Sequence, residues 1–144
     1  EILAQDRLVI GLLDNSLYKA NAVYTSRFSE DGTCEHFIFI PHEQINFECP
    51  QSVSLIHEVG HLIHTGKTRK ILQLPESFLL VSAFMFPNMK SAPALVRMDI
   101  FADSFMMAAT NGTELEELRP APHMGREFRA LLNVYFTDLI REMD

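Results

Sequence analysis

The sequence predicts a single α+β domain over residues 1–144, mostly helical, with a short antiparallel β-hairpin in its first third. Two segments rich in β-branched and aromatic residues, 20–28 and 33–40, are separated by the turn sequence Ser29–Gly32. From residue 50 onward, apolar residues recur at helical spacing between proline and glycine boundaries. With 144 residues and 47% hydrophobic content, the chain can bury a core as one globular domain.

The expected elements follow one another along the chain. Residues 3–13 carry apolar side chains at helical intervals and predict a first helix, which the hairpin follows. A helix over residues 52–64 comes next, with Pro50 suited to its first turn and Gly66 to its end. Further helices are predicted near 75–86, 92–110, 113–118 and 124–142, bounded by Pro75, Pro87, Pro93, Asn111–Gly112 and Pro120–Pro122.

The helix over 52–64 contains the sequence His57-Glu58-Val59-Gly60-His61. Residues four apart are separated by about one turn, so both histidine side chains leave the same face and can share one metal ion. Neutral imidazole is a good zinc ligand, and Glu58 can take a proton from a metal-bound water. The spacing therefore predicts a hydrolytic zinc centre with His57 and His61 as ligands and Glu58 as the catalytic residue.

Two other residues of this helix bear on the site. Gly60 costs about 1 kcal/mol relative to alanine inside a helix, which indicates that another part of the chain approaches the backbone there. His64 also faces the metal side, but three ligands on one short helical stretch rarely meet at one tetrahedral centre. We expect His64 to be packed or to support a ligand. His64 and Lys67 also exclude the metzincin continuation, which needs glycine and histidine at those positions.

A catalytic zinc usually takes three protein ligands, so a further donor is expected downstream. Asp99 and Asp103 interrupt the apolar stretch 94–108 and stand four residues apart, on one helical face. We expect Asp99 to ligate the metal and Asp103 to accept the second ring N–H of a ligating histidine. The alternative is a solvated helix face with Arg97 as a surface partner. Structural roles are expected for the other downstream acids, Glu76, Glu114, Glu116 and Glu117.

The stretch 57–64, followed by Asp99-Ile100-Phe101-Ala102-Asp103-Ser104-Phe105, resembles the ImmA/IrrE-like metallopeptidases, which are small gluzincin-type proteins. Asp99 stands where that family usually has glutamate. The resemblance implies a zincin-like fold and a zinc peptidase that hydrolyses peptide bonds in a specific protein, often a transcriptional regulator. The alternative is a zincin-fold regulatory or binding module that holds metal with little or no proteolysis.

In gluzincin-type peptidases a strand beside the cleft holds the substrate peptide by strand addition, and segment 33–40 is the candidate for that role. The alternative is that the strands only cover the core. The histidines without an interpretable partner spacing are His36, His42 and His123.

Composition excludes several partners. The net charge of −7, without a lysine and arginine cluster, argues against direct nucleic-acid binding. The most apolar run, 78–86, is too short to span a membrane. The sequence shows no signal peptide, and Cys34 and Cys49 are interpreted as free thiols in a reducing compartment, with a disulfide between them as the alternative. We therefore expect a cytoplasmic protein.

Overall fold

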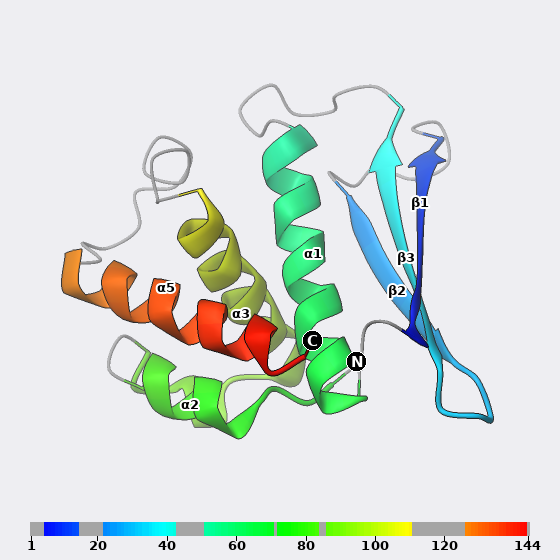
Figure 1. Cartoon of the computed structure of the whole chain (residues 1–144). Helices are drawn as coiled ribbons and strands as arrows, with labels where there is room; N and C mark the ends of the chain where they lie inside the picture. Colours follow the sequence, from blue (N-terminus) through cyan, green and yellow to red (C-terminus); the bar gives the residue numbers. More distant parts are fainter. Residues whose placement is uncertain are drawn as a thin grey trace.

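The computed structural model describes residues 5–14, 22–42, 51–70, 72–83, 86–110 and 126–143. Helix α1 lies between a small β-sheet on one side and the remaining helices on the other (Figure 1). This arrangement confirms the α+β class. The elements in chain order are β1 (Arg7–Leu13), β2 (Val23–Phe28), β3 (Cys34–Pro41), α1 (Gln51–Thr68), α2 (Glu76–Ser82), the 3-10 helix η2 (Met89–Ser91), α3 (Ala94–Ala109) and α5 (Arg126–Arg141).

The sheet has the strand order β1-β3-β2 and is mixed. Strands β2 and β3 pair antiparallel across the turn after Phe28, as predicted, but β1 pairs parallel with β3, so the sheet is more than a hairpin. The predicted helix over 3–13 is therefore wrong where the structure describes it. A short apolar run does not distinguish a buried helix from a strand by periodicity, and Val9 and Ile10 favour the strand. Gly11 lets the Phe39 ring lie against the β1 backbone, where a Cβ atom would be 3.0 Å from that ring.

The central position of β3 overturns the prediction that segment 33–40 receives a substrate strand. Both edges of β3 are hydrogen-bonded, one to β1 and the other to β2, so no peptide can pair with it. The edges that remain open among the described strands are those of β1 and β2.

Close packing between α1 and α3 fixes the middle of the molecule. A Cβ atom on Gly60 would lie 2.7 Å from the Ala102 Cα, which confirms the expected close approach at this glycine. Three buried phenylalanines from α2, α3 and α5 fill the space behind, with ring centroids 4.7 Å apart for Phe78 and Phe101 and 5.3 Å apart for Phe101 and Phe136. The helices thus share one core next to the sheet.

The helix boundaries agree with the sequence in part. Helix α1 continues past Gly66 to Thr68, so the predicted end at Gly66 is wrong, and Arg69 leaves the helix with φ at 56°. Helix α2 is shorter than predicted, whereas α3 and α5 lie within the predicted ranges. The predicted helix 113–118 lies outside the described residues.

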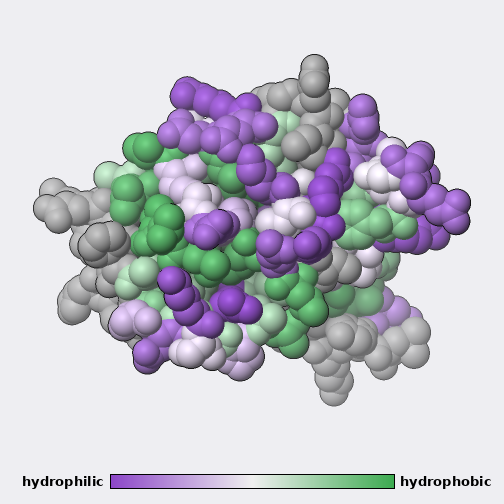
Figure 2. Space-filling model, turned by 90° about the horizontal axis from the view of Figure 1, so that it is seen from below, coloured by the Kyte–Doolittle hydropathy of each residue, from purple (hydrophilic) through white to green (hydrophobic). Residues whose placement is uncertain are grey.

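The surface mixes apolar and polar residues. Seen from below, hydrophobic residues occupy a larger area on the helical side than on the sheet side, interrupted by hydrophilic ones (Figure 2). Among the described helices, none is both long enough and apolar enough to span a bilayer.

Candidate metal centre

Helices α1 and α3 bring two imidazoles and one carboxylate together. The Nε2 atoms of His57 and His61 are 3.2 Å apart, and Asp99 Oδ1 lies 3.4 Å from His61 Nε2 and 3.9 Å from His57 Nε2. Nitrogen and oxygen ligands at about 2.1 Å from a tetrahedral ion are separated by about 3.4 Å from one another. The three donor atoms therefore have the spacing that one metal ion requires, and among the described residues they form the group suited to hold one.

The two helices position these groups for different reasons. His57 and His61 are one turn apart on α1, so their rings project from the same face. Asp99 belongs to α3, and it reaches the histidines because Gly60 allows the α3 backbone at Ala102 to approach α1. The position of Asp99 therefore depends on the contact between Gly60 and Ala102, two residues 42 positions apart in sequence.

Asp103 lies one turn beyond Asp99 and holds the first histidine. Its Oδ1 is 2.9 Å from His57 Nδ1, so the ring donates Nδ1–H to the carboxylate and turns Nε2 toward the other two donors. Burial lowers the pKa of His57, but the hydrogen bond and charge of Asp103, with two further carboxylates, outweigh burial and raise it. The placement matches the supporting position predicted for Asp103.

His61 occupies the more buried side of the group. Burial lowers the pKa of His61 to about 3, and the charges of His57 and His64 act in the same direction. The ring is therefore neutral at pH 7, which is the form that binds a metal ion. His64 is itself buried, with its ring edge-on to His61 and to Phe101 at centroid distances of 5.7 Å each. This is the packed position expected for His64.

Glu58 lies beside the group, between α1 and the sheet. Its side chain is buried, with 8% exposure, and accepts a hydrogen bond from the main-chain N–H of Tyr24 on β2. Burial raises the pKa of Glu58, although the charge of His57 and the Tyr24 N–H oppose the shift. A carboxylate with a raised pKa beside a cation site is suited to accept a proton near neutral pH.

The two aspartates are more exposed than their place in an apolar stretch predicted. Asp99 is 65% exposed and Asp103 is 23% exposed, so neither is the deeply buried carboxylate that an apolar stretch suggested. Asp99 lies on a solvent-exposed face of α3, as the alternative interpretation expected, at the edge of the contact between α3 and α1. Helical phase, and not burial, places it next to the histidines.

The remaining sequence candidates lie elsewhere. Glu76 is exposed at the first residue of α2, where a carboxylate suits the helix dipole. Cys34 is a buried free thiol. The candidates that fall outside the described residues are Cys49, Glu114, Glu116, Glu117 and His123.

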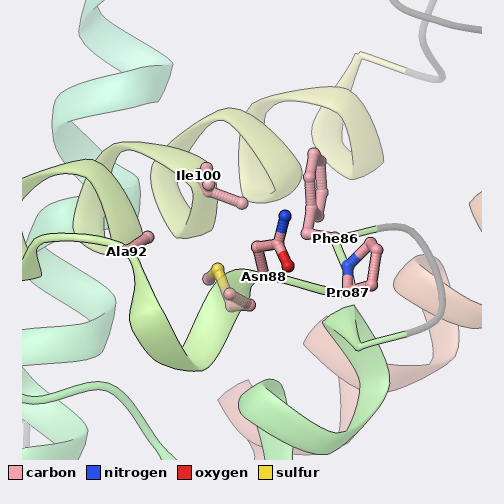
Figure 3. Close-up of a pocket in the computed structure, with 6 residues that line it drawn as sticks. Phe86, Pro87, Asn88, Ala92 and Ile100 are labelled. Atoms are coloured by element: carbon pink, nitrogen blue, oxygen red, sulfur yellow. The ribbon is translucent and has the colours of Figure 1, made fainter.

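A separate small pocket adjoins α3. It has a volume of about 240 Å³ and is lined by Phe86, Pro87, Asn88, Met89, Ala92 and Ile100. Figure 3 shows Asn88 between Ile100 and Phe86, with an otherwise apolar wall. None of the candidate ligands contributes to this pocket, so it is distinct from the metal centre.

No sequence pattern connected Tyr24 and His36 with the site. His36 is buried on β3 and hydrogen-bonds Tyr24, whose ring stacks on His61. Alternating burial of Cys34, His36 and Ile38 could have shown that His36 faces inward. Its partners Tyr24 and Asp6 are 12 and 30 positions away in sequence and leave no local pattern.

In comparisons with known proteins, no family model, curated protein sequence or solved structure gave a significant match to this chain. The function is therefore argued from the site.

Proposed function

We propose that the protein is a zinc-dependent metallopeptidase of the HExxH type, similar to the ImmA/IrrE-like family. The observation that carries the proposal is the meeting of His57 Nε2, His61 Nε2 and Asp99 Oδ1, all within 4.8 Å of one another, beside the buried Glu58. Two imidazoles and one carboxylate are a donor set of catalytic zinc, which keeps a further position for water or substrate. The exposure of Asp99 leaves that side of the group open to solvent.

Each residue then has a distinct role. His57, His61 and Asp99 hold the ion, and Asp103 fixes the ring of His57 through its Nδ1–H. When bound, zinc acidifies a water molecule and polarises a substrate carbonyl. Glu58 accepts the proton of the attacking water and can return it to the leaving amine.

A peptide substrate suits the surroundings of Glu58. Strand β2 is an edge strand, and the Tyr24 N–H that binds Glu58 places this edge beside the candidate base. An extended peptide that added to β2 would bring its backbone to the centre, with main-chain hydrogen bonds supplying affinity. We infer that the substrate is a segment of a specific protein, such as a transcriptional regulator, in the cytoplasm. These last points follow from the family resemblance and stay predictions.

Metal analysis and a peptide library together test the proposal. The purified protein should carry about one zinc per chain and cleave peptides of a digest, with cleavage sites identified by mass spectrometry. Glu58→Gln should retain zinc and lose every cleavage, whereas Glu76→Gln, the same chemical change at an exposed position, should keep both. Zinc binding without any cleavage would favour the regulatory module. Iron in place of zinc would contradict the assignment of the metal, because two histidines and one carboxylate also suit non-haem iron.

A further inference from the structure

A chain of hydrogen bonds joins the C-terminal end of α1 to the neighbourhood of the metal centre. Arg69 Nη1 lies 2.8 Å from both carboxylate oxygens of Asp6, and Asp6 Oδ2 lies 3.1 Å from His36 Nε2. On the other side of the same ring, His36 Nδ1 is 2.8 Å from the Tyr24 hydroxyl. These four residues are thus connected in series: Arg69 directly follows α1, Asp6 directly precedes β1, and His36 and Tyr24 lie on β3 and β2.

The series is buried at its centre. The side chains of Asp6 and His36 are 3% and 1% exposed, and a buried carboxylate is costly unless it is paired and hydrogen-bonded. Asp6 meets this condition with Arg69, with His36 and with the main-chain N–H of Cys34. Arg69 adopts a positive φ of 56°, a conformation that costs a non-glycine residue about 1 kcal/mol. Its two contacts with Asp6 offset this cost.

Tyr24 forms the end of the series that faces the metal centre. Its ring stacks on His61, with centroids 6.1 Å apart and planes 24° apart, and its main-chain N–H donates to Glu58. One residue therefore contacts both a candidate ligand and the candidate base. The hydroxyl also hydrogen-bonds Thr65, one turn after His61 on α1, so it is held by His36 and Thr65 together.

We propose that Tyr24 is a positioning residue of this centre, which orients the ring of His61 and is itself locked by the buried series Arg69–Asp6–His36. The inference rests on the proposed metal site. It adds a support for His61, because among the described residues no carboxylate binds His61 Nδ1 as Asp103 binds His57 Nδ1. The histidine on each side of the ion then has its own support: Asp103 hydrogen-bonds His57, and Tyr24 packs against His61.

Cobalt substitution provides a readout that a purely structural role would not change. The d–d spectrum and affinity of bound Co²⁺ depend on ligand geometry, and hydrolysis is not needed to measure them. Loss of a group that orients a ligand typically weakens metal binding by about tenfold or more. We expect a loss of this size, with a shifted spectrum, in Tyr24→Leu. Tyr24→Phe keeps the ring and the main-chain N–H and should show the same change to a smaller extent.

Tyr135→Phe is the matched control. Tyr135 is also part-buried and loses one hydrogen bond, to Ser77, but it lies on α5 and has no contact with the candidate ligands among the described residues. It should lower the free energy of unfolding of the metal-free protein by less than Tyr24→Phe, because its one hydrogen bond is exposed, and it should leave the cobalt spectrum unchanged.

The outcomes separate the two proposals. Wild-type affinity and spectrum in a folded Tyr24→Leu variant would refute the positioning role and leave the metal site standing. If that variant does not fold, Tyr24→Phe decides, and an unchanged spectrum there refutes the role. Failure of the wild-type protein to bind Co²⁺ would refute both the metal site and the inference.

Discussion

Replacing Gly60 with alanine tests whether the packing of α1 against α3 sets the metal geometry. Alanine in a helix interior is favoured over glycine by about 1 kcal/mol, so propensity alone predicts a more stable protein. The added Cβ, however, would lie 2.7 Å from the Ala102 Cα, 3.1 Å from its Cβ and 3.2 Å from its carbonyl oxygen. Because the nearest of these atoms is backbone, the helices must separate by about 1 Å, and such overpacking costs about 1–3 kcal/mol.

We predict a small loss of stability together with a large loss of zinc affinity. The two opposing terms leave a net destabilisation of about 1 kcal/mol. Separation of the helices carries Asp99 and Asp103 away from the histidines, so zinc affinity should fall by about 10–100-fold, as when a ligand loses its support. Gly60→Val should increase both effects.

Urea unfolding of the metal-free protein gives the stability, and competition with a chromophoric chelator gives the zinc affinity. A Gly60→Ala variant that is more stable than wild type and binds zinc equally well would refute the reasoning, since the close contact would then have no consequence for the site.

Three further predictions follow from other contacts. Asp103→Asn should weaken zinc binding by about 10–100-fold with an unchanged circular dichroism spectrum, and wild-type affinity would contradict the role of its bond to His57. Phe101→Ala should lower the free energy of unfolding by about 3–5 kcal/mol, measured in urea, because its ring is fully buried between Phe78 and Phe136. A loss below 1 kcal/mol would contradict this packing. Burial raises the pKa of Asp6, but hydrogen bonds from Arg69, His36 and the Cys34 N–H outweigh it, so the pKa lies below its ordinary value. Asp6 therefore contributes stability above its unfolded pKa of about 4, and the contribution is lost as pH falls through the lower folded pKa. The stability difference between wild-type and Asp6→Asn metal-free protein should be constant from about pH 7 to 5 and shrink below about 4; a difference that grows on acidification would contradict the sign.

The helical half of the fold was predictable because its signals are local. Apolar spacing and flanking prolines located α1, α3 and α5 to within a few residues. The strand β1 was missed because its short, mostly apolar run fits a helix or a strand equally well, and its partner β3 is 28 residues away. Parallel pairing with a distant strand decides the conformation there, and no pattern within 7–13 contains that information.

The candidate site was likewise predictable only where its signals are local. The motif on α1 gave His57, Glu58 and His61 from spacing alone, and helical phase gave the pair Asp99 and Asp103 on a second helix. The support of His61 by Tyr24 was not predictable, because it depends on contacts between residues 12 to 63 positions apart in sequence. Short-range periodicity identifies groups that share an element, whereas the order of strands in the sheet decides which groups meet across elements.

X-ray absorption at the zinc edge of the metal-loaded protein tests whether His57 and His61 hold a zinc ion. We expect one zinc per chain, with two imidazole nitrogens from His57 and His61 and oxygen ligands, all at about 2.0–2.2 Å, and loss of bound zinc in the double variant His57→Ala with His61→Ala. A protein that binds no zinc, or a metal shell that contains sulfur at about 2.3 Å or survives that double variant, would contradict it.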